Sequence, residues 1–163
     1  MMALFAVTMA ATAGEVTITQ DAATMTWTAG TDDTYGQGFS TTAEGFNLGL
    51  WKNKSTSVIV EPAKEIRVYK NAVLVIEAVS GENITSVVMT TTAEDKTSNM
   101  TANDVTDAAV ADADAKTVTW SGNTNKLVLL ANNGQVRVKQ LVITYGEAEP
   151  VTQVEKPVLS VKP

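Results

Sequence analysis

The chain contains neither cysteine nor histidine among its 163 residues. The lack of cysteine excludes disulfides and thiolate nucleophiles, and the lack of histidine excludes every mechanism that needs an imidazole base. Together the two absences exclude the zinc sites that cysteine and histidine build. Carboxylate-only metal sites and chemistry that depends on aspartate or glutamate remain possible.

Positive charge is also scarce. Twelve lysines and arginines face eighteen aspartates and glutamates, which gives a formal net charge of −6 and an isoelectric point of about 4.6. The only arginines are Arg67 and Arg137, and no run of basic residues occurs. Such a chain repels phosphate backbones, so we do not expect nucleic acid as a partner.

Long apolar runs are nearly absent. Residues 1–13, MMALFAVTMAATA, form the one candidate, and it is too short to anchor the chain in a bilayer, so we expect no membrane insertion. Its end, Ala11-Thr12-Ala13, fits a signal-peptidase site before Gly14. The run has no lysine or arginine ahead of it, so the predicted signal peptide would be truncated. The alternative is a buried first strand or helix. We favour export, to the cell surface or the medium.

What the sequence does have is threonine and valine, which favour strands. Hydrophobic residues make up 44% of the chain, enough for a globular core. We predict an all-β fold, an antiparallel β-sandwich over residues 14–146. The expected strands are VTIT (16–19), TMTWTA (24–29), 46–50, a short piece at 58–60, 66–69, 73–78, ITSVVMTTT (84–92), 117–120, 126–131 and 135–145.

Several local features refine this prediction. Residues 66–78 have the pattern of a hairpin with its turn at Lys70-Asn71, and the apolar return strand suggests a central position. Residues 30–45 are predicted to form a loop. The polar segment 93–115 is predicted to be a long loop with a short helix near 103–112. A bulge near Lys139-Gln140 would reconcile the two apolar phases of the last strand.

Residues 147–163 differ in composition from the rest. They carry three of the four prolines and read as a linker followed by the start of a further module. We therefore expect one domain of a longer modular protein, with neighbouring domains of the same polypeptide as partners.

The order of these features resembles a jelly-roll domain found in secreted modular proteins of Bacteroidetes. The matching stretches are GFNLGLWKN (45–53), IRVYKNAVLVIEA (66–78), NITSVVMT (83–90), TVTWSG (117–122) and VRVKQLVITY (136–145). The resemblance implies a jelly-roll, galactose-binding-domain-like sandwich on an exported protein, with an accessory binding role and no defined ligand.

Two groups of residues are candidates for binding a sugar. Trp51 is out of phase with Phe46, Leu48 and Leu50, so its ring could face solvent and stack on a sugar, with Lys52 and Asn53 bonding to hydroxyls. Alternatively, Trp51 simply covers the edge of the sandwich.

The second group is Tyr69 with Arg67, on the outer face of the predicted hairpin. Here the alternative is ordinary cross-strand pairing of Arg67 with Glu65 or Glu77. By contrast, Trp27 and Trp120 are predicted to lie in the core or at its rim.

Asp32 and Asp33 are candidates for a structural Ca²⁺ site, since they lie in a glycine-rich loop with carbonyl oxygens nearby. A solvated loop is the alternative, and we expect no other cofactor. No pair of carboxylates is fixed across a cleft, so catalysis is not expected.

These observations leave two functional hypotheses. One is a non-catalytic accessory module that binds a polysaccharide or glycan weakly. The other is a structural spacer or adhesion-stalk domain without a small ligand. A hydrolase is a third, weaker alternative.

Overall fold

The structure is a computed structural model, and it describes residues 13–146. Most of the predicted signal peptide and all of the predicted linker lie outside these residues. The described chain is all-β, as predicted. Its strands are β1 (Gly14–Thr19), β2 (Thr28–Asp32), β3 (Gly36–Ala43), β4 (Phe46–Trp51), β5 (Ile66–Val68), β6 (Val73–Ala78), β7 (Ile84–Thr91), β8 (Met100–Ala102), β9 (Val105–Asp112), β10 (Thr117–Thr124), β11 (Lys126–Leu130) and β12 (Val136–Tyr145), with a short 3-10 turn at Glu94–Lys96.

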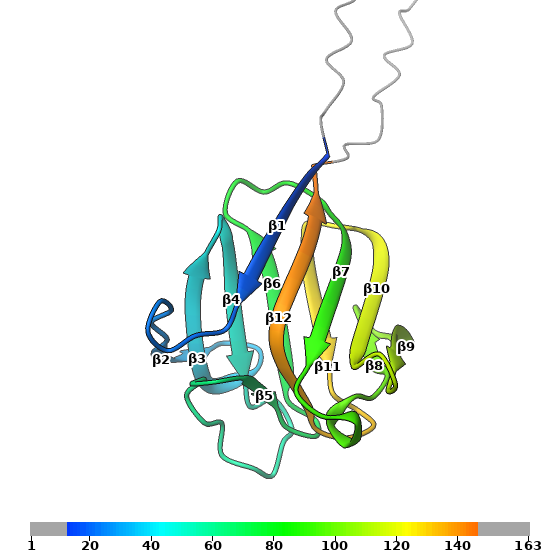
Figure 1. Ribbon diagram of the computed structural model, residues 1–163. Coiled ribbons are helices and arrows are strands. Elements are labelled where there is room, and N and C mark those ends of the chain that lie inside the picture. The colour runs from blue at the N-terminus through cyan, green and yellow to red at the C-terminus, as the bar shows by residue number, and fades with distance from the viewer. Residues whose placement is uncertain (1–12, 147–163) are drawn as a thin grey trace, which may run out of the picture.

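The strands form one large antiparallel sheet that curls back on itself (Figure 1). Its order is β1-β12-β7-β10-β9-β8-β11-β6-β4-β3-β2, and β5 pairs separately with β12. Strand β9 makes the bend, because its second half pairs with β10 and its first half with β8. This arrangement is consistent with the predicted β-sandwich of jelly-roll type.

A single large core lies inside the curl. It takes alternate side chains from both halves of the sheet, such as Leu48 and Ile76 from one half and Val87 and Ile143 from the other. This is the period-2 burial expected of strands with one face covered. Trp27 and Trp120 are buried in this core, which confirms their predicted positions.

The segment 66–78 is not a hairpin, and that prediction is wrong. Strand β5 pairs with β12, whereas β6 lies between β4 and β11 in the other half of the sheet. The turn itself is where we predicted it, with Asn71 at φ 67° and Ala72 N donating to Tyr69 O over 2.9 Å. It carries the chain from one half of the sheet to the other. The central position predicted for residues 73–78 is confirmed.

The predicted loop at 30–45 is also wrong, because it contains most of β2 and all of β3. Asp32 and Gly36 close the first turn, and Glu44-Gly45, both at positive φ, close the second. The strand predicted at 24–29 begins only at Thr28. Residues 58–60 pair with no strand, and Val58 is 79% exposed.

The polar segment 93–115 holds strands in place of the predicted loop and helix. Asn103 and Asp104 have φ of 44° and 66° and form a two-residue turn between β8 and β9. Positive φ at both central residues is the requirement of a type I′ hairpin turn, which asparagine and aspartate tolerate. The turn, together with pairing to β10 and β8, makes 105–112 a strand despite its polarity.

Strand β12 organises the domain along its length. Its register shifts between Val138 and Gln140, which confirms the predicted bulge. Tyr145 at its end pairs with Gly14 at the start of β1. The described domain therefore begins and ends at one pole, and the beginning of β12 lies at the opposite, distal pole (Figure 1).

Candidate functional site

Trp51 lies on the outer face of its sheet, opposite to Leu48 and Leu50, as its phase predicted. Trp51 is nevertheless only 9% exposed, so it does not face solvent as the sugar-stacking alternative requires. It packs with Val73 and Val75 in a second, smaller apolar cluster. The ring lies flat because Gly49 makes room for it, since a Cβ there would be 2.2 Å from the indole nitrogen. Trp51 as it lies offers little surface for stacking on a sugar.

Lys52 and Asn53 continue the chain beyond β4. Asn53 has a φ of 48°, and its side-chain nitrogen donates to Asn71 O over 3.0 Å, so its amide fixes one loop against another. Lys52 borders a shallow hollow of about 410 Å³ with Phe39 and Val58. Both residues therefore lie near the distal pole, and Asn53 has a structural role in holding the two loops together.

Asp32 and Asp33 stand in the turn between β2 and β3. One oxygen of Asp32, Oδ1, accepts hydrogen bonds from the backbone amides of Thr34 (2.8 Å) and Tyr35 (2.9 Å), as in an Asx turn. Within residues 13–146, no three acidic side chains come together as a metal site. The calcium site stays a prediction, and the hydrogen bonds of the turn are sufficient to explain an aspartate at position 32.

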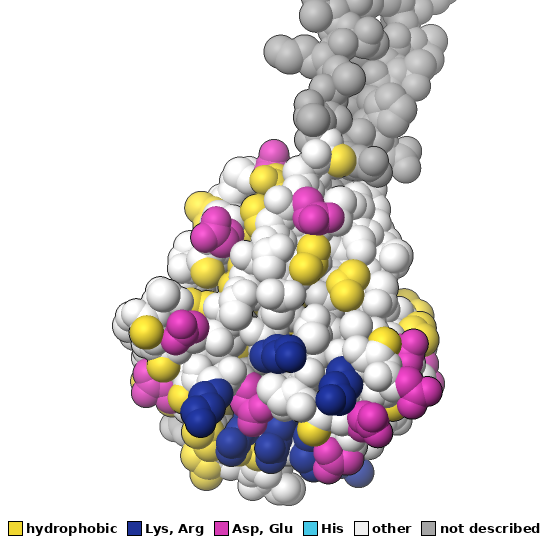
Figure 2. All heavy atoms as spheres, in the orientation of Figure 1, with side chains coloured by type: hydrophobic (Ala, Val, Ile, Leu, Met, Phe, Trp, Pro, Cys, Tyr) yellow, Lys and Arg dark blue, Asp and Glu magenta, His cyan; other side chains and the backbone are white. Residues whose placement is uncertain are grey.

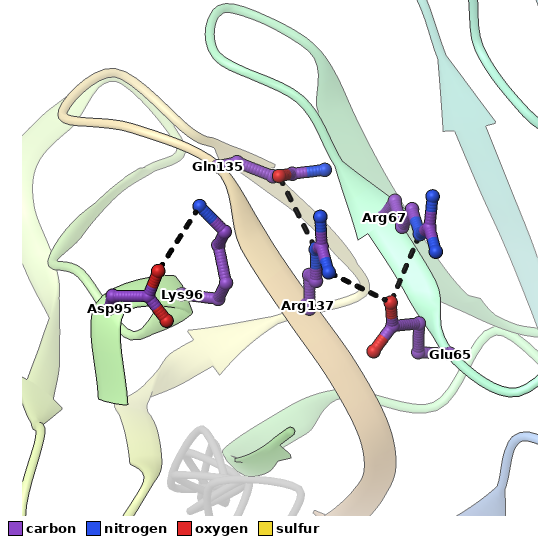
Figure 3. A network of polar contacts seen from close by, with 6 residues as sticks. All are labelled: Glu65, Arg67, Asp95, Lys96, Gln135 and Arg137. Carbon is purple, nitrogen blue, oxygen red and sulfur yellow. Dashed lines mark hydrogen bonds and ion pairs between the residues drawn. The ribbon is translucent and has the colours of Figure 1, made fainter. Parts of the chain in front are cut away.

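Arg67 and Tyr69, the second predicted group, belong to a cluster at the distal pole. Pairing of β5 with β12 sets Arg67 directly opposite Arg137. Glu65 stands between the two, and its Oε1 lies 3.0 Å from Arg67 Nε and 3.5 Å from Arg137 Nη1 (Figure 3). Two guanidinium groups thus share one carboxylate oxygen. The predicted pairing of Arg67 with Glu65 is confirmed, while the pairing with Arg137 was not foreseen.

Glu65 and Arg67 are both ionised near neutral pH. A hydrogen bond with the Tyr69 hydroxyl and another with Glu65 raise the pKa of Arg67 above its ordinary value. Burial of Glu65 by itself would raise the pKa of its carboxyl. The hydrogen bonds from Thr92 and Arg67 and the charges of both arginines outweigh that effect and lower this pKa. The carboxylate is therefore ionised and both arginines are cations.

Gln135 completes the cluster. Its Oε1 accepts a hydrogen bond from Arg137 Nε over 3.3 Å. That contact fixes the amide orientation, because a flipped amide would set a donor against a donor. Its Nε2 is buried and has no hydrogen-bond partner among the residues that the structure describes. In Figure 3 this nitrogen points to the side on which Arg67 lies.

The cluster is open to solvent and basic in its surroundings. The side chains of Arg67 and Arg137 are 42% and 31% exposed. Figure 2 shows lysine and arginine gathered at the distal end of this face, with carboxylates among them. The opposite end, where the described chain begins and ends, carries few cations. We call Arg67, Arg137, Glu65, Gln135 and Tyr69 the distal cluster.

A hydroxyl-lined groove is a second concave feature of the described residues, besides the hollow beside Lys52. It lies between β1 and β3, near the two open edges of the curled sheet, and has a volume of about 750 Å³. Some of its hydroxyls bond within the fold, for example Thr41 to Thr26 O and Thr42 to Asn47. The groove offers neither a cation nor an aromatic ring. Its lining residues are Thr17, Ile18, Thr19, Thr24, Met25, Thr26, Thr28, Ser40, Thr41, Thr42, Ala43, Glu44, Asn47 and Leu48.

Comparison with known proteins adds nothing to this geometry, since no protein-family model, no curated protein and no solved structure matches the chain. Among residues 13–146, no helix is long and apolar enough to cross a membrane. The function is therefore argued from the site. Sequence reasoning missed Glu65, Gln135 and Arg137 as site residues. The one available signal was that the only two arginines lie in predicted strands.

Proposed function

We propose that this domain is a non-catalytic accessory module of an exported or cell-surface bacterial protein, and that it binds carbohydrate weakly through the distal cluster. The observation that carries the proposal is the position of the half-buried Tyr69 ring beside exposed guanidinium groups at the pole farthest from Gly14 and Tyr145. From Arg137 to Tyr145 the strand extends about 26 Å, at roughly 3.3 Å a residue.

The chemistry of the cluster suits a sugar. The face of an aromatic ring can pack against the C–H groups of a pyranose, and guanidinium groups donate to its oxygens. The site is shallow and open, which suits a polymer that lies across the surface. A shallow site with few contacts gives low affinity.

The proposal can be tested by affinity electrophoresis against a panel of polysaccharides. Tyr69→Leu keeps an apolar side chain against the core but removes the ring, so retardation by the bound glycan should be lost while the thermal midpoint stays close to that of the parent. Tyr35→Leu is the matched control, because Tyr35 is also half-buried but packs against the cluster of Trp51 on the other face.

Two outcomes would contradict the proposal. One is that no polysaccharide retards the parent protein. The other is that Tyr69→Leu is retarded as strongly as the parent. If Thr42→Trp, which fills the hydroxyl-lined groove, alone abolished retardation, the binding site would lie in that groove and the distal cluster would be the wrong location.

A further inference from the structure

The distal cluster has more hydrogen-bond donors than acceptors. Each guanidinium has five N–H donors and no acceptor. Glu65 Oε1 accepts a hydrogen bond from Arg67 and forms an ion pair with Arg137, and Gln135 Oε1 accepts from Arg137. Two positive charges and one negative leave the three ionised groups at +1.

Like charges directly opposite each other on neighbouring strands are destabilising unless a counter-charge separates them. Arg67 and Arg137 occupy such a pair, and the single carboxylate of Glu65 stands between them. A second anion would lower the remaining repulsion. The buried Nε2 of Gln135 also gains from an acceptor, because a buried donor without a partner costs stability.

The hydrogen-bonding groups of the distal cluster distinguish a neutral sugar from an anionic one. A neutral sugar presents hydroxyls, which both donate and accept, and is matched by a mixture of donors and acceptors. A carboxylate or sulfate presents acceptors only, and a guanidinium fork can bind it through two parallel hydrogen bonds. Donors outnumber acceptors in the distal cluster, which fits the second case.

We propose that Arg67 and Arg137 bind an anionic group of a glycan, a carboxylate or a sulfate, next to the ring of Tyr69, with the buried side-chain nitrogen of Gln135 directly behind Arg137. This inference rests on the proposed carbohydrate-binding function and names its substrate class. The net charge of −6 opposes densely charged polymers. An acidic glycan with spaced charges meets only the local field, since ionic screening acts within about 10 Å.

Matched pairs of immobilised polymers test the inference by biolayer interferometry. A pectin with widely spaced free carboxylates is compared with its fully methyl-esterified form, and a lightly sulfated dextran with dextran, so each pair differs only in its anionic group. We expect the acidic member of at least one pair to bind about tenfold tighter than its neutral partner. The preference should weaken as NaCl rises from about 0.05 M to about 0.5 M. The pair that shows the preference tells carboxylate from sulfate.

Three substitutions locate the site. Arg67→Gln and Arg137→Gln each remove one charge and should each remove most of the acidic preference. Gln135→Glu replaces the free donor with an acceptor and should do the same, while its new carboxylate can pair with Arg137 and so keeps the fold. Lys126→Gln is the control, because it makes the same charge change on an exposed side chain of β11.

The outcomes separate this inference from the proposed function. If neutral and acidic members bind alike and Tyr69→Leu abolishes both, the carbohydrate function stands and the anionic preference is wrong. If no polymer binds, both are wrong. If the preference for the acidic polymer survives all three substitutions, the anion-binding site lies elsewhere on the molecule. Equally tight binding of poly-L-glutamate would show that the cluster recognises charge and not a glycan.

Discussion

At the scale of single residues, the surface available to a ligand depends on what covers each aromatic side chain. Trp51 is the last residue of β4 and Tyr69 follows β5, and in both strands alternate residues enter the core. Trp51 is covered because Gly49 lets its ring lie against the sheet. Tyr69 remains half-exposed beside Arg67. Phase alone predicts the face on which a side chain lies, but not whether neighbours then close over it.

Glu65 gives the cluster a testable dependence on pH. Its pKa is lower in the folded protein than the value of about 4.3 usual for an unfolded chain. The ionised carboxylate therefore stabilises the fold above that value, and the stabilisation is lost as pH falls through the folded pKa. Urea unfolding at several pH values should show that the parent loses more stability between about pH 5 and pH 3 than Glu65→Gln does.

All other side chains are the same in both proteins, so the difference between the two curves isolates Glu65. Curves that run parallel throughout this range would mean that Glu65 has the same pKa in the folded and unfolded chains. The contacts with Arg67 and Arg137 would then have no energetic effect.

At the scale of strands, the sequence predicted where most strands lie but not which of them pair. Alternation identified β4, β6, β7 and the last three strands, and the change of phase in β12 identified its bulge. Pairing is decided by contacts between distant residues. The pattern of 66–78 is compatible with both a hairpin and a crossing between the two halves of the sheet, and only the second pairs β5 with β12.

The same reason explains why the candidate site was predicted in part. Arg67 and Tyr69 are close in sequence and could be paired by inspection. Arg137 and Gln135 reach them only through the pairing of β5 with β12. The strands missed at 28–43 and 105–112 were hidden by polar residues. They are defined by tight turns at Glu44-Gly45 and Asn103-Asp104, whose positive φ angles mark hairpins.

The turn at Asn103-Asp104 can be tested by substitution. Asp104 has a φ of 66°, a conformation that valine adopts only with strain. We expect Asp104→Val to lower the free energy of unfolding by about 1–2 kcal/mol, and Asp104→Gly to leave it unchanged or raise it by about 0.5 kcal/mol. Urea unfolding measures both.

Asp114→Val serves as the control, since Asp114 is also exposed in a turn but is not among the residues at positive φ. Equal losses for the two valine variants would mean that the backbone at Asp104 is not strained by a branched side chain. The interpretation of 102–105 as a type I′ hairpin turn would then be wrong.

At the scale of the whole molecule, the two ends of the domain share one pole and the distal cluster occupies the other. An in-line spacer would hold its neighbours at opposite poles, whereas Gly14 and Tyr145 are paired side by side. This arrangement suits a module that projects its far end toward a ligand. The gathering of lysine and arginine at that end, on a chain with a net charge of −6, agrees with such a role (Figure 2).

The most direct test of the account is an NMR titration of the ¹⁵N-labelled protein with oligogalacturonate and with sulfated dextran oligosaccharides. We predict that at least one ligand shifts the side-chain resonances of Arg67 Nε, Arg137 Nε and Gln135 Nε2, and the amides of β5 and the start of β12. The amides of β1 and β3 that line the groove should not move. Shifts confined to that groove, or no shifts with either ligand, would contradict the assignment of the distal cluster as an acidic-glycan site.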